Sequence, residues 1–435
     1  MRAGHLVTGA AIANCLGTDS RTVFERAFAG VDAFSPAAAF ADFPFATALG
    51  ILPSISSGSE GSEGSGDRAD EDVLDCTMTR LATVALASVR QIRPAVSAAV
   101  ERWGAHRVAY VFASSTGGLE ETERSLAPDP RLPVKAAGYR YADHGIDATS
   151  AAIARSLGAC GVRLAVSTAC SSSFNALASA IRLIDHGLAD AAVVGSADSL
   201  CRTTVFGFHS LGLTAPAATQ PFARDRAGIT LGEGSAYVLI ERSEMGGGDP
   251  AGFAGGAGGK APRGIERGVD ATRRCALARI FGIGAASDAY HHTSPHPDGI
   301  GGQLCMRQAL DRAGLTPNDI DHVSAHGTGT RLNDAAEAAA VTRVFERRVP
   351  LTATKSLTGH TLGSAGLTAL VLAVESLRRQ EIPATLRATP LDESLGVAVV
   401  DKRTPARLRH VLVNAFGFGG SNASVVVSQP GAGRA

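Results

Sequence analysis

The stretch Arg163–Asp185, RLAVSTACSSSFNALASAIRLID, predicts a strand that turns sharply into a helix. Its beginning, Leu164-Ala165-Val166, is a short apolar run of the kind that fills a buried strand. Apolar side chains then recur at helical spacing, at Phe174, Leu177, Ile181 and Ile184. Gly187 follows and ends the helix, because glycine readily adopts the left-handed backbone of a helix C-terminus. Cys170 is therefore expected at the corner between strand and helix.

The predicted corner would suit Cys170 as a nucleophile. Backbone N–H groups at the start of a helix are unpaired and partly positive, so they favour a thiolate and can hold a developing oxyanion. A buried structural cysteine is the alternative interpretation, and it is the commoner one for an isolated cysteine. The neighbouring Thr168 and Ser171–Ser173 favour the nucleophile.

Composition narrows the class of protein. Basic and acidic residues number 41 each, so the formal net charge is zero and gives no reason to expect nucleic acid or a membrane surface as a partner. The seven cysteines are odd in number and contain no CxxC pair, which argues against a disulfide framework or a zinc site and favours the cytoplasm. We find no signal-peptide pattern and no apolar run of about 18 residues, so we expect no membrane span.

Strands and helices are expected to alternate along the 435 residues. Apolar runs predict strands at 6–9 (ending in a turn at Gly9), 107–113, 164–166, 191–194, 237–241, 276–283, 319–325, 350–353, 411–413 and 423–427. Besides the helix after Cys170, we expect helices at 21–29, 74–89, 302–313, 335–345 and 361–379. The polar, glycine-rich stretches 54–67 and 246–259 are predicted to be surface loops. A strand, the helix after Cys170 and the next strand would form a βαβ crossover.

The alternation predicts an α/β protein with two similar halves, 1–259 and 260–435. Thr168-Ala169-Cys170 and Thr358-Gly359-His360 both follow a short apolar run and precede a helix. A match of three residues is weak alone, but it agrees with the repeated alternation. The first half would then carry Cys170, and the second would carry the histidines described next.

Three further segments carry candidate groups. VSAHGTGT at 323–330 puts His326 after a predicted strand, TKSLTGH at 354–360 puts His360 before a helix, and NAFGFGGSN at 414–422 forms a glycine-rich turn. A neutral imidazole donates through one nitrogen, so two of them could bind one carbonyl oxygen and stabilise an enolate. Backbone N–H groups of the turn and of Cys170 could form an oxyanion hole, although a plain hairpin turn is the alternative interpretation.

Together, TACSSS, HGTGT, TKSLTGH and NAFGFGGSN resemble the β-ketoacyl-acyl carrier protein synthases of the thiolase superfamily. PFARDRAGITLGEG, SDAYHHTSP and VTGAAIANCLG extend the resemblance over nearly the whole chain. It implies a thiolase-like, five-layered α-β-α-β-α fold with two pseudo-repeated halves, and decarboxylative Claisen condensation giving a 3-oxoacyl-carrier protein. It implies an acyl carrier protein as partner, and a homodimer or a heterodimer with a related ketosynthase-like subunit. No metal or cofactor is implied, since phosphopantetheine arrives on the carrier.

The resemblance also implies roles for single residues. Cys170 would take the acyl chain as a thioester, and His326 and His360 would bind the malonyl thioester carbonyl. The backbone N–H groups of Cys170 and Phe418 would hold the tetrahedral oxyanion, and the Phe418 ring would gate acyl entry. Lys355 would pair with Glu337 and support His326. The remaining matches are the substrate-lining positions Thr116, Thr293, Thr328, Thr330 and Phe416, and Asn422, which matches a position near a structural cation in some members.

Some features depart from the family's pattern. The segment 119–144 and the loop 54–67 are unusual, and Thr116 stands where some members carry a bulkier residue that limits chain length. A specialised type II system making polyketide or polyene chains is therefore as well supported as fatty acid synthesis.

Three alternatives remain open. A non-catalytic partner subunit, similar to a chain-length factor, would typically lack the nucleophile. A papain-like hydrolase would need only one histidine, with an Asn or Asp that orients it. A biosynthetic thiolase would need a second cysteine in the last glycine-rich turn, where this chain has Phe418.

Overall fold

The computed structural model describes residues 4–54, 71, 79–125, 139–243, 276–346 and 348–432. In these ranges, eleven strands form a mixed sheet in the order β13-β11-β10-β15-β16-β9-β1-β8-β6-β4-β5. The strands of the first half are β1 (His5–Asn14), β4 (Val108–Ala113), β5 (Arg163–Val166), β6 (Ala191–Asp198) and β8 (Gly234–Arg242). Those of the second half are β9 (Ala278–Ser287), β10 (His322–Ser324), β11 (Pro350–Thr352), β13 (Ala398–Val399), β15 (His410–Gly417) and β16 (Ser421–Ser428).

The two halves repeat one strand arrangement. The order β1-β8-β6-β4-β5 in the first half corresponds to β9-β16-β15-β10-β11 in the second. In each half the first two pairings are antiparallel and the next two are parallel. The halves meet where His5–Val7 of β1 pair with Ala278–Ile280 of β9. The predicted pseudo-repeat is therefore confirmed.

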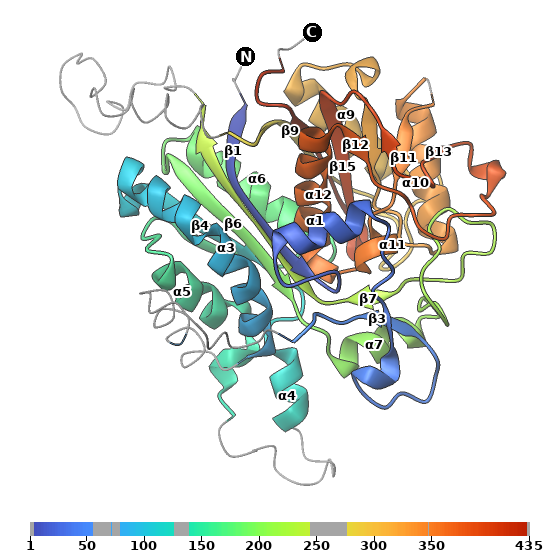
Figure 1. Ribbon diagram of the computed structural model, residues 1–435, viewed down its shortest axis with the longest axis horizontal. Helices are drawn as coiled ribbons and strands as arrows, with labels where there is room; N and C mark the ends of the chain where they lie inside the picture. Colours follow the sequence, from blue (N-terminus) through green and yellow to red (C-terminus); the bar gives the residue numbers. More distant parts are fainter. Residues whose placement is uncertain are drawn as a thin grey trace.

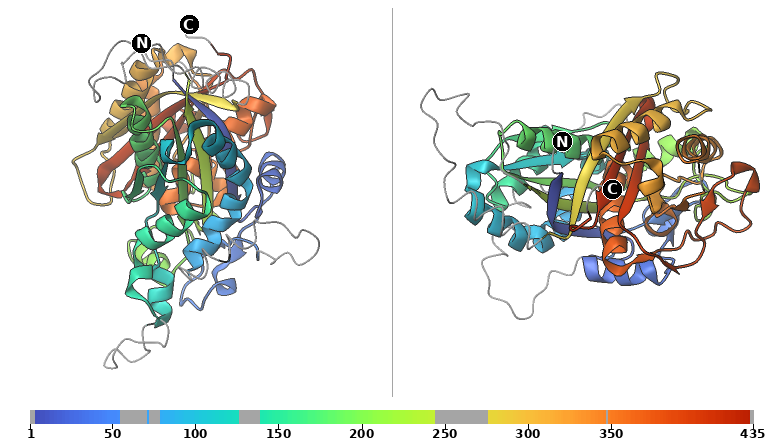
Figure 2. Two further views of the ribbon diagram at one scale, coloured as in Figure 1. Left: turned by 90° about the vertical axis from the view of Figure 1, so that its left-hand side faces the viewer. Right: turned by 90° about the horizontal axis from the view of Figure 1, so that it is seen from above.

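Helices form three layers around the two halves of the sheet (Figure 1). Buried residues of α6 (Ser172–Asp185) and α12 (Ala365–Arg379) share one core with both halves, so these helices form the central layer. The outer face of the first half is covered by α3 (Arg80–Trp103) and α5 (Ile146–Ser156). The outer face of the second is covered by α9 (Ile300–Ala313) and α10 (Arg331–Val344) (Figure 2). This is the predicted α-β-α-β-α order.

Shorter elements connect these layers. The helices are α1 (Ser20–Phe28), α4 (Leu119–Ser125), α7 (Arg202–Ser210) and α11 (Lys355–Thr358). The strands are β2 (Ser35–Pro36), β3 (Ala48–Gly50), β7 (Leu231–Gly232), β12 (Glu381–Ile382) and β14 (Thr404–Pro405).

Glycines in β9 allow α9 to lie very close to the sheet. A Cβ at Gly282 would lie 2.1 Å from the Ala309 carbonyl oxygen, and one at Gly284 would lie 1.9 Å from that of Cys305. Both distances are far below van der Waals contact, so neither position has room for a side chain. The contact fixes the second half's outer helix layer against its sheet.

The structure corrects three predictions about single elements. The first strand does not end in a turn at Gly9, because β1 continues to Asn14 with an irregular register between Val7 and Gly9. The helix expected from residue 361 begins only at Ala365, after a short 3-10 turn at Leu362–Ser364. The strand before Cys170 is not buried: β5 is an edge strand, and Leu164 is 37% exposed in the single chain.

The crossover around Cys170 is of the predicted βαβ type. Both β5 and β6 are parallel to β4, which lies between them, and α6 makes the connection. Other predictions fall on undescribed residues: the loop 246–259, most of the loop 54–67, the start of the helix expected from residue 74, and the boundary at 259/260. Over the described ranges, no helix has the length and apolar character needed to cross a bilayer.

Candidate functional site

Cys170 lies in a tight turn between β5 and α6. Ala169 has a positive φ of 50°, a left-handed conformation that residues other than glycine rarely adopt. The Ser172 hydroxyl accepts a hydrogen bond from the Thr168 N–H at 2.8 Å, and the Ser171 hydroxyl donates to the Thr168 carbonyl at 2.9 Å. The hydroxyl residues that flank Cys170 therefore hold this turn in place.

The Cys170 thiol is buried, and its pKa reflects this. Burial raises the pKa to about 11, while the charge of Lys355 and the backbone N–H of Phe418 lower it in part. From its place at a helix start, Cys170 was expected to favour the thiolate. The loss of solvation on burial outweighs the effect of the helix start, so Cys170 rests as a thiol. A Cβ at Gly417 would lie 3.2 Å from the backbone nitrogens of Cys170 and Ser171, so the glycine lets the Phe418 turn lie against the thiol.

His326 and His360 face each other as neutral hydrogen-bond donors. Their ring centroids are 5.3 Å apart and their planes are nearly perpendicular, at 86°. Nδ1 of His360 accepts from the Leu362 N–H at 3.0 Å, and Nδ1 of His326 lies 3.1 Å from the Lys355 ammonium, which can only donate. Each ring therefore carries its proton on Nε2. Burial, followed by the charge of Lys355, holds the pKa of both imidazoles well below 6.5.

The predicted ion pair between Lys355 and Glu337 is wrong. Both residues are described, and their charged groups do not form an ion pair: the Lys355 ammonium donates to the His326 carbonyl at 2.5 Å and contacts its ring. Glu337, on α10, instead accepts from the backbone N–H groups of His326 at 2.8 Å and Gly327 at 2.7 Å. Burial lowers the pKa of Lys355 to about 8, and the charge of Glu337 opposes this shift.

Two buried carboxylates of α10 hold the loop that carries His326. Glu337 holds the beginning of this loop through the N–H groups of His326 and Gly327, and it also accepts a hydrogen bond from the Asn414 amide at 3.0 Å. Asp334 holds its end, accepting from the Gly329 N–H at 3.1 Å, and from the Phe222 N–H at 2.8 Å. Asn414 belongs to a motif quoted above, but a single sequence gives no sign that its side chain reaches α10.

A cavity of about 190 Å³ brings most of the predicted site residues together. Cys170, His326 and His360 all line it. Thr293, Thr328, Thr330, Phe416, Phe418 and Asn422 line it as well. The Phe418 ring stacks on Phe208 of α7, with centroids 5.4 Å apart, and Phe208 was not singled out from the sequence. The rest of the wall is largely apolar and includes Leu211, Leu213 and Ile229.

Thr116 is missing from the described residues that line this cavity. Its hydroxyl and its N–H donate to one oxygen of Asp198, at 2.9 and 2.8 Å. The other oxygen of this fully buried carboxylate accepts from the Ser364 N–H at 3.1 Å. Burial raises the pKa of Asp198. Asp198 thus joins the Thr116 loop to the turn after His360, a link that no local pattern in the sequence indicates.

Asn422 is engaged within the protein. Its amide nitrogen donates to Asp288 at 3.0 Å and to the Gly420 carbonyl at 3.1 Å. Over the described ranges, no group of three or more His, Cys, Asp or Glu side chains is arranged to hold a metal ion.

Comparisons with known proteins identify the family. Residues 6–245 match the family model for the β-ketoacyl synthase N-terminal domain, and residues 277–389 match that for the C-terminal domain. The 3-oxoacyl-[acyl-carrier-protein] synthase 2 of Vibrio cholerae is 31% identical over 75% of this chain and 77% of its own. The enzyme of the same name from Staphylococcus aureus is 26% identical over 97% of this chain and 100% of its own.

A solved structure is similar over nearly the full length. The complex of the ketosynthase ApeO with its chain length factor ApeC, from Xenorhabdus doucetiae, matches with a TM-score of 0.80 and 30% identity, covering 98% of both chains. The two domain matches cover most of the chain, up to residue 389, and their order follows the two halves of the fold. The chain therefore belongs to the β-ketoacyl synthase family.

Proposed function

We propose that this condensing, acyl-transferring enzyme joins a carrier-bound malonyl unit to an acyl chain held on Cys170, giving a 3-oxoacyl-carrier protein. The observation that carries the proposal is the shared cavity of Cys170, His326 and His360. One thiol and two Nε2–H donors, supplied by different halves of the fold, are the groups that such a condensation needs.

In the first step, the acyl group of a pantetheine thioester is transferred to the Cys170 sulfur by thioester exchange. The sulfur attacks the acyl carbonyl, the new C–S bond forms, and the pantetheine sulfur leaves with the proton that the Cys170 thiol gives up. The backbone N–H groups of Cys170 and Phe418 would hold the oxyanion of the tetrahedral intermediate. The tight turn at Ala169 supports this role because it fixes the Cys170 amide.

In the second step, a malonyl thioester binds with its carbonyl oxygen between His326 and His360. Loss of carbon dioxide leaves the electron pair of the broken C–C bond on an enolate, whose oxygen accepts from both Nε2–H groups. The enolate carbon attacks the Cys170 thioester, the C–C bond forms, and the sulfur leaves as a thiolate that is then protonated. Decarboxylation supplies the carbanion, so no strong base is required, and neutral imidazoles suit the step.

We further propose that both thioesters arrive on the phosphopantetheine arm of an acyl carrier protein, and that the enzyme needs no other cofactor. The two curated relatives are named 3-oxoacyl-[acyl-carrier-protein] synthase 2, and ApeO was solved with a chain length factor. A dimer with a second copy, or with a related ketosynthase-like subunit, is the matching assembly. The product would belong to fatty acid or to polyketide and polyene synthesis. The free thiols of Cys15, Cys160, Cys170, Cys201 and Cys305 fit a cytoplasmic location.

The purified chain, incubated with hexanoyl- and malonyl-carrier protein, tests this proposal. Mass spectrometry of the carrier should show the 3-oxooctanoyl product, and the Cys170→Ala variant should give none. Condensation only after addition of a related subunit would indicate an obligate heterodimer. If Cys170 takes no acyl group even then, the chain is a non-catalytic partner of the chain-length-factor type and the proposal fails.

A further inference from the structure

A segment of the first half, Thr219–Gly228, lies along the loop 326–330 that carries His326. The Thr219 hydroxyl donates to the Thr328 carbonyl at 2.8 Å, and the Gly228 N–H donates to the Gly329 carbonyl at 3.0 Å. This segment contains the whole motif PFARDRAG, to which no role has been given so far. Its contacts with the loop suggest that it sets the loop's position.

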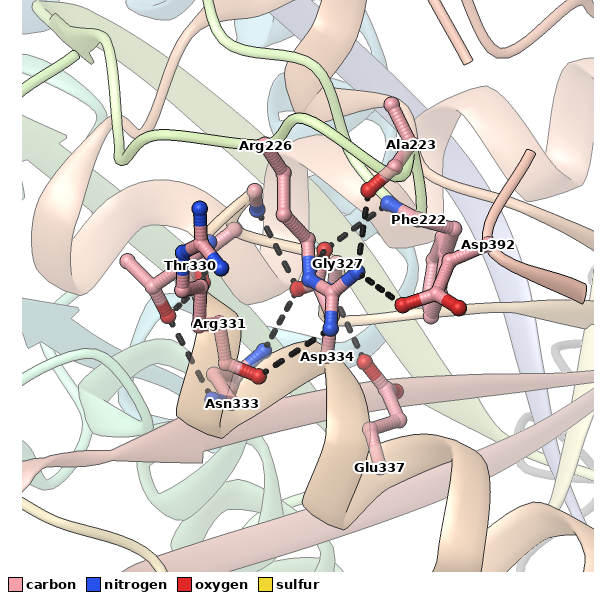
Figure 3. Close-up of polar contacts among 12 residues, drawn as sticks. Phe222, Ala223, Arg226, Gly327, Thr330, Arg331, Asn333, Asp334, Glu337 and Asp392 are labelled. Atoms are coloured by element: carbon pink, nitrogen blue, oxygen red, sulfur yellow. Dashed lines mark hydrogen bonds and ion pairs between the residues drawn. The ribbon is translucent and has the colours of Figure 1, made fainter. Parts of the chain in front are cut away.

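Arg226, in the same segment, makes a second set of contacts, with the start of α10 and with Asp392 (Figure 3). Its side chain is almost fully buried, and one terminal nitrogen donates to Asp392 at 2.7 Å and to the Ala223 carbonyl at 2.9 Å. The other donates to the carbonyl of Arg331, the first residue of α10, at 3.4 Å. Nε of Arg226 lies 4.0 Å from a carboxylate oxygen of Asp334. The guanidinium thus joins three separate segments of the chain.

The start of α10, which Arg226 holds, controls one wall of the cavity. Thr330 caps this helix, and its hydroxyl lies 2.9 Å from that of Thr328, with both residues lining the cavity. The Asp334 and Glu337 carboxylates of the same helix hold both ends of the loop, as described above. A shift of α10 would therefore move His326 and both threonines together, whereas Cys170 stands in the separate turn before α6.

We propose that Arg226 is a positioning residue for the malonyl half of the reaction, because it fixes the start of α10 and with it the cavity wall that receives the malonyl thioester. The inference rests on the proposed function. Arginine suits this place because its planar fork reaches several acceptors at fixed angles, which the single ammonium of lysine cannot do. Acylation of Cys170 should depend on Arg226 far less.

Two half-reactions test this separation. Malonyl-pantetheine and hexanoyl-pantetheine serve as probes, so that the identity of the carrier does not matter. Acylation of Cys170 by hexanoyl-pantetheine is followed by intact mass, and carbon dioxide release from malonyl-pantetheine is followed with the hexanoyl-loaded enzyme. Arg226→Met should lower kcat/KM for malonyl-pantetheine roughly 100-fold, mainly through KM, because displacements near 1 Å can have effects of that size. The acylation rate should change little.

Further variants separate positioning from general stability. Arg226→Lys should stay impaired, and Asp392→Asn, which weakens one arm of the fork, should give a smaller loss of the same kind. Arg403→Met, which removes an exposed ion pair with Glu381, is the matched control and should leave both half-reactions unchanged. If Arg226→Met does not fold, Arg226→Lys and Asp392→Asn carry the test.

Two results would overturn the inference. Equal losses in both half-reactions would mean that Arg226 contributes only to overall stability. An unchanged KM for malonyl-pantetheine would mean that Arg226 does not position the cavity wall. If the unmodified enzyme releases no carbon dioxide while Cys170 is acylated, the proposed function itself fails, so the two failures can be told apart.

Discussion

At the scale of single residues, proton positions govern what the site can do. Cys170 rests as a thiol with a pKa of about 11, next to Lys355 with a pKa of about 8. The thiolate fraction grows with pH, but Lys355 loses its positive charge between about pH 7 and 9, which raises the pKa of Cys170 further. The two titrations therefore oppose each other over that interval.

This opposition predicts the pH dependence of Cys170 alkylation by iodoacetamide. The rate should rise from pH 6 upward, but by less than about tenfold per pH unit between pH 7 and 9. Lys355→Met should be slower at pH 7 and should rise about tenfold per unit throughout. Peptide mass spectrometry follows Cys170, with the exposed Cys160 as an internal control. A plateau below pH 9 would show that the thiolate is far better stabilised than the burial of Cys170 indicates.

The two histidines should separate the half-reactions. His326→Ala and His360→Ala each remove one donor from the enolate oxygen, so malonyl decarboxylation should fall about 100- to 1000-fold. Acylation of Cys170 should persist, since neither ring is needed for it. Carbon dioxide release and the intact mass of the enzyme are measured side by side. Lost acylation with retained decarboxylation would reverse the assigned roles.

Thr116 is expected to stabilise the fold through its hydrogen bonds to Asp198, a role that the sequence did not suggest. Thr116→Val removes one hydroxyl donor from the buried Asp198 carboxylate, so the free energy of unfolding should fall by about 1–3 kcal/mol. Urea denaturation measures this, with the exposed Thr404→Val as control. No loss of stability would mean that the other donors to Asp198 suffice.

The sequence motifs pointed to the residues that meet in the cavity, but not to the residues that hold them there. Cys170, His326 and His360 could be found because each stands in a recognisable local pattern. Asp198 and Asn414 could not, because their hydrogen bonds join segments far apart in the chain. The partners of Glu337 could not, because they are backbone N–H groups that no side-chain pattern marks. The Lys355–Glu337 pair was implied by the family resemblance, but backbone N–H groups of the loop occupy the Glu337 carboxylate.

At the scale of elements, the contact between β9 and α9 depends on glycine. Gly284→Ala should lower the free energy of unfolding by at least about 1–3 kcal/mol, because its Cβ would overlap the Cys305 carbonyl. Gly207→Ala is the matched control: Gly207 lies inside α7 with open space around it, so alanine should stabilise by about 0.5–1 kcal/mol. Urea denaturation compares them. Equal effects would mean that α9 moves away from β9 easily.

Element types followed from hydrophobic periodicity, whereas element ends often did not. Gly9 looked like a turn, yet β1 continues through it because β8 pairs with β1 on both sides of Gly9. The start of α12 was placed too early because apolar residues continue into the 3-10 turn at Leu362–Ser364. Such ends are decided by pairing partners that periodicity does not contain.

At the scale of the whole molecule, β5 leaves an open sheet edge among the residues that the structure describes. An exposed edge strand with apolar side chains is a template for pairing with another chain, which agrees with the proposed dimer. The sequence predicted burial of this strand from its apolar run. Within one chain the prediction is wrong, because a single sequence does not distinguish burial by its own fold from burial by a partner.

A charge on this edge should disrupt the assembly. Leu164→Arg should shift the protein from dimer to monomer in light scattering, because burying an unpaired guanidinium in an interface is unfavourable. Leu188→Arg is the control: Leu188 is 56% exposed but lies outside the strands. A dimer that survives Leu164→Arg would place the contact between subunits elsewhere.

The fixed ring protons have a consequence for the lifetime of the acyl-enzyme. Nδ1 of both imidazoles already accepts a hydrogen bond, and Nε2 carries the proton. A water molecule beside the thioester would therefore meet only N–H donors. It could pass its proton to neither ring without breaking the hydrogen bond to Nδ1 of that ring. Water is thereby left unactivated next to a reactive ester. Under the proposed function, the acyl chain on Cys170 would then wait for its extender unit instead of being released early.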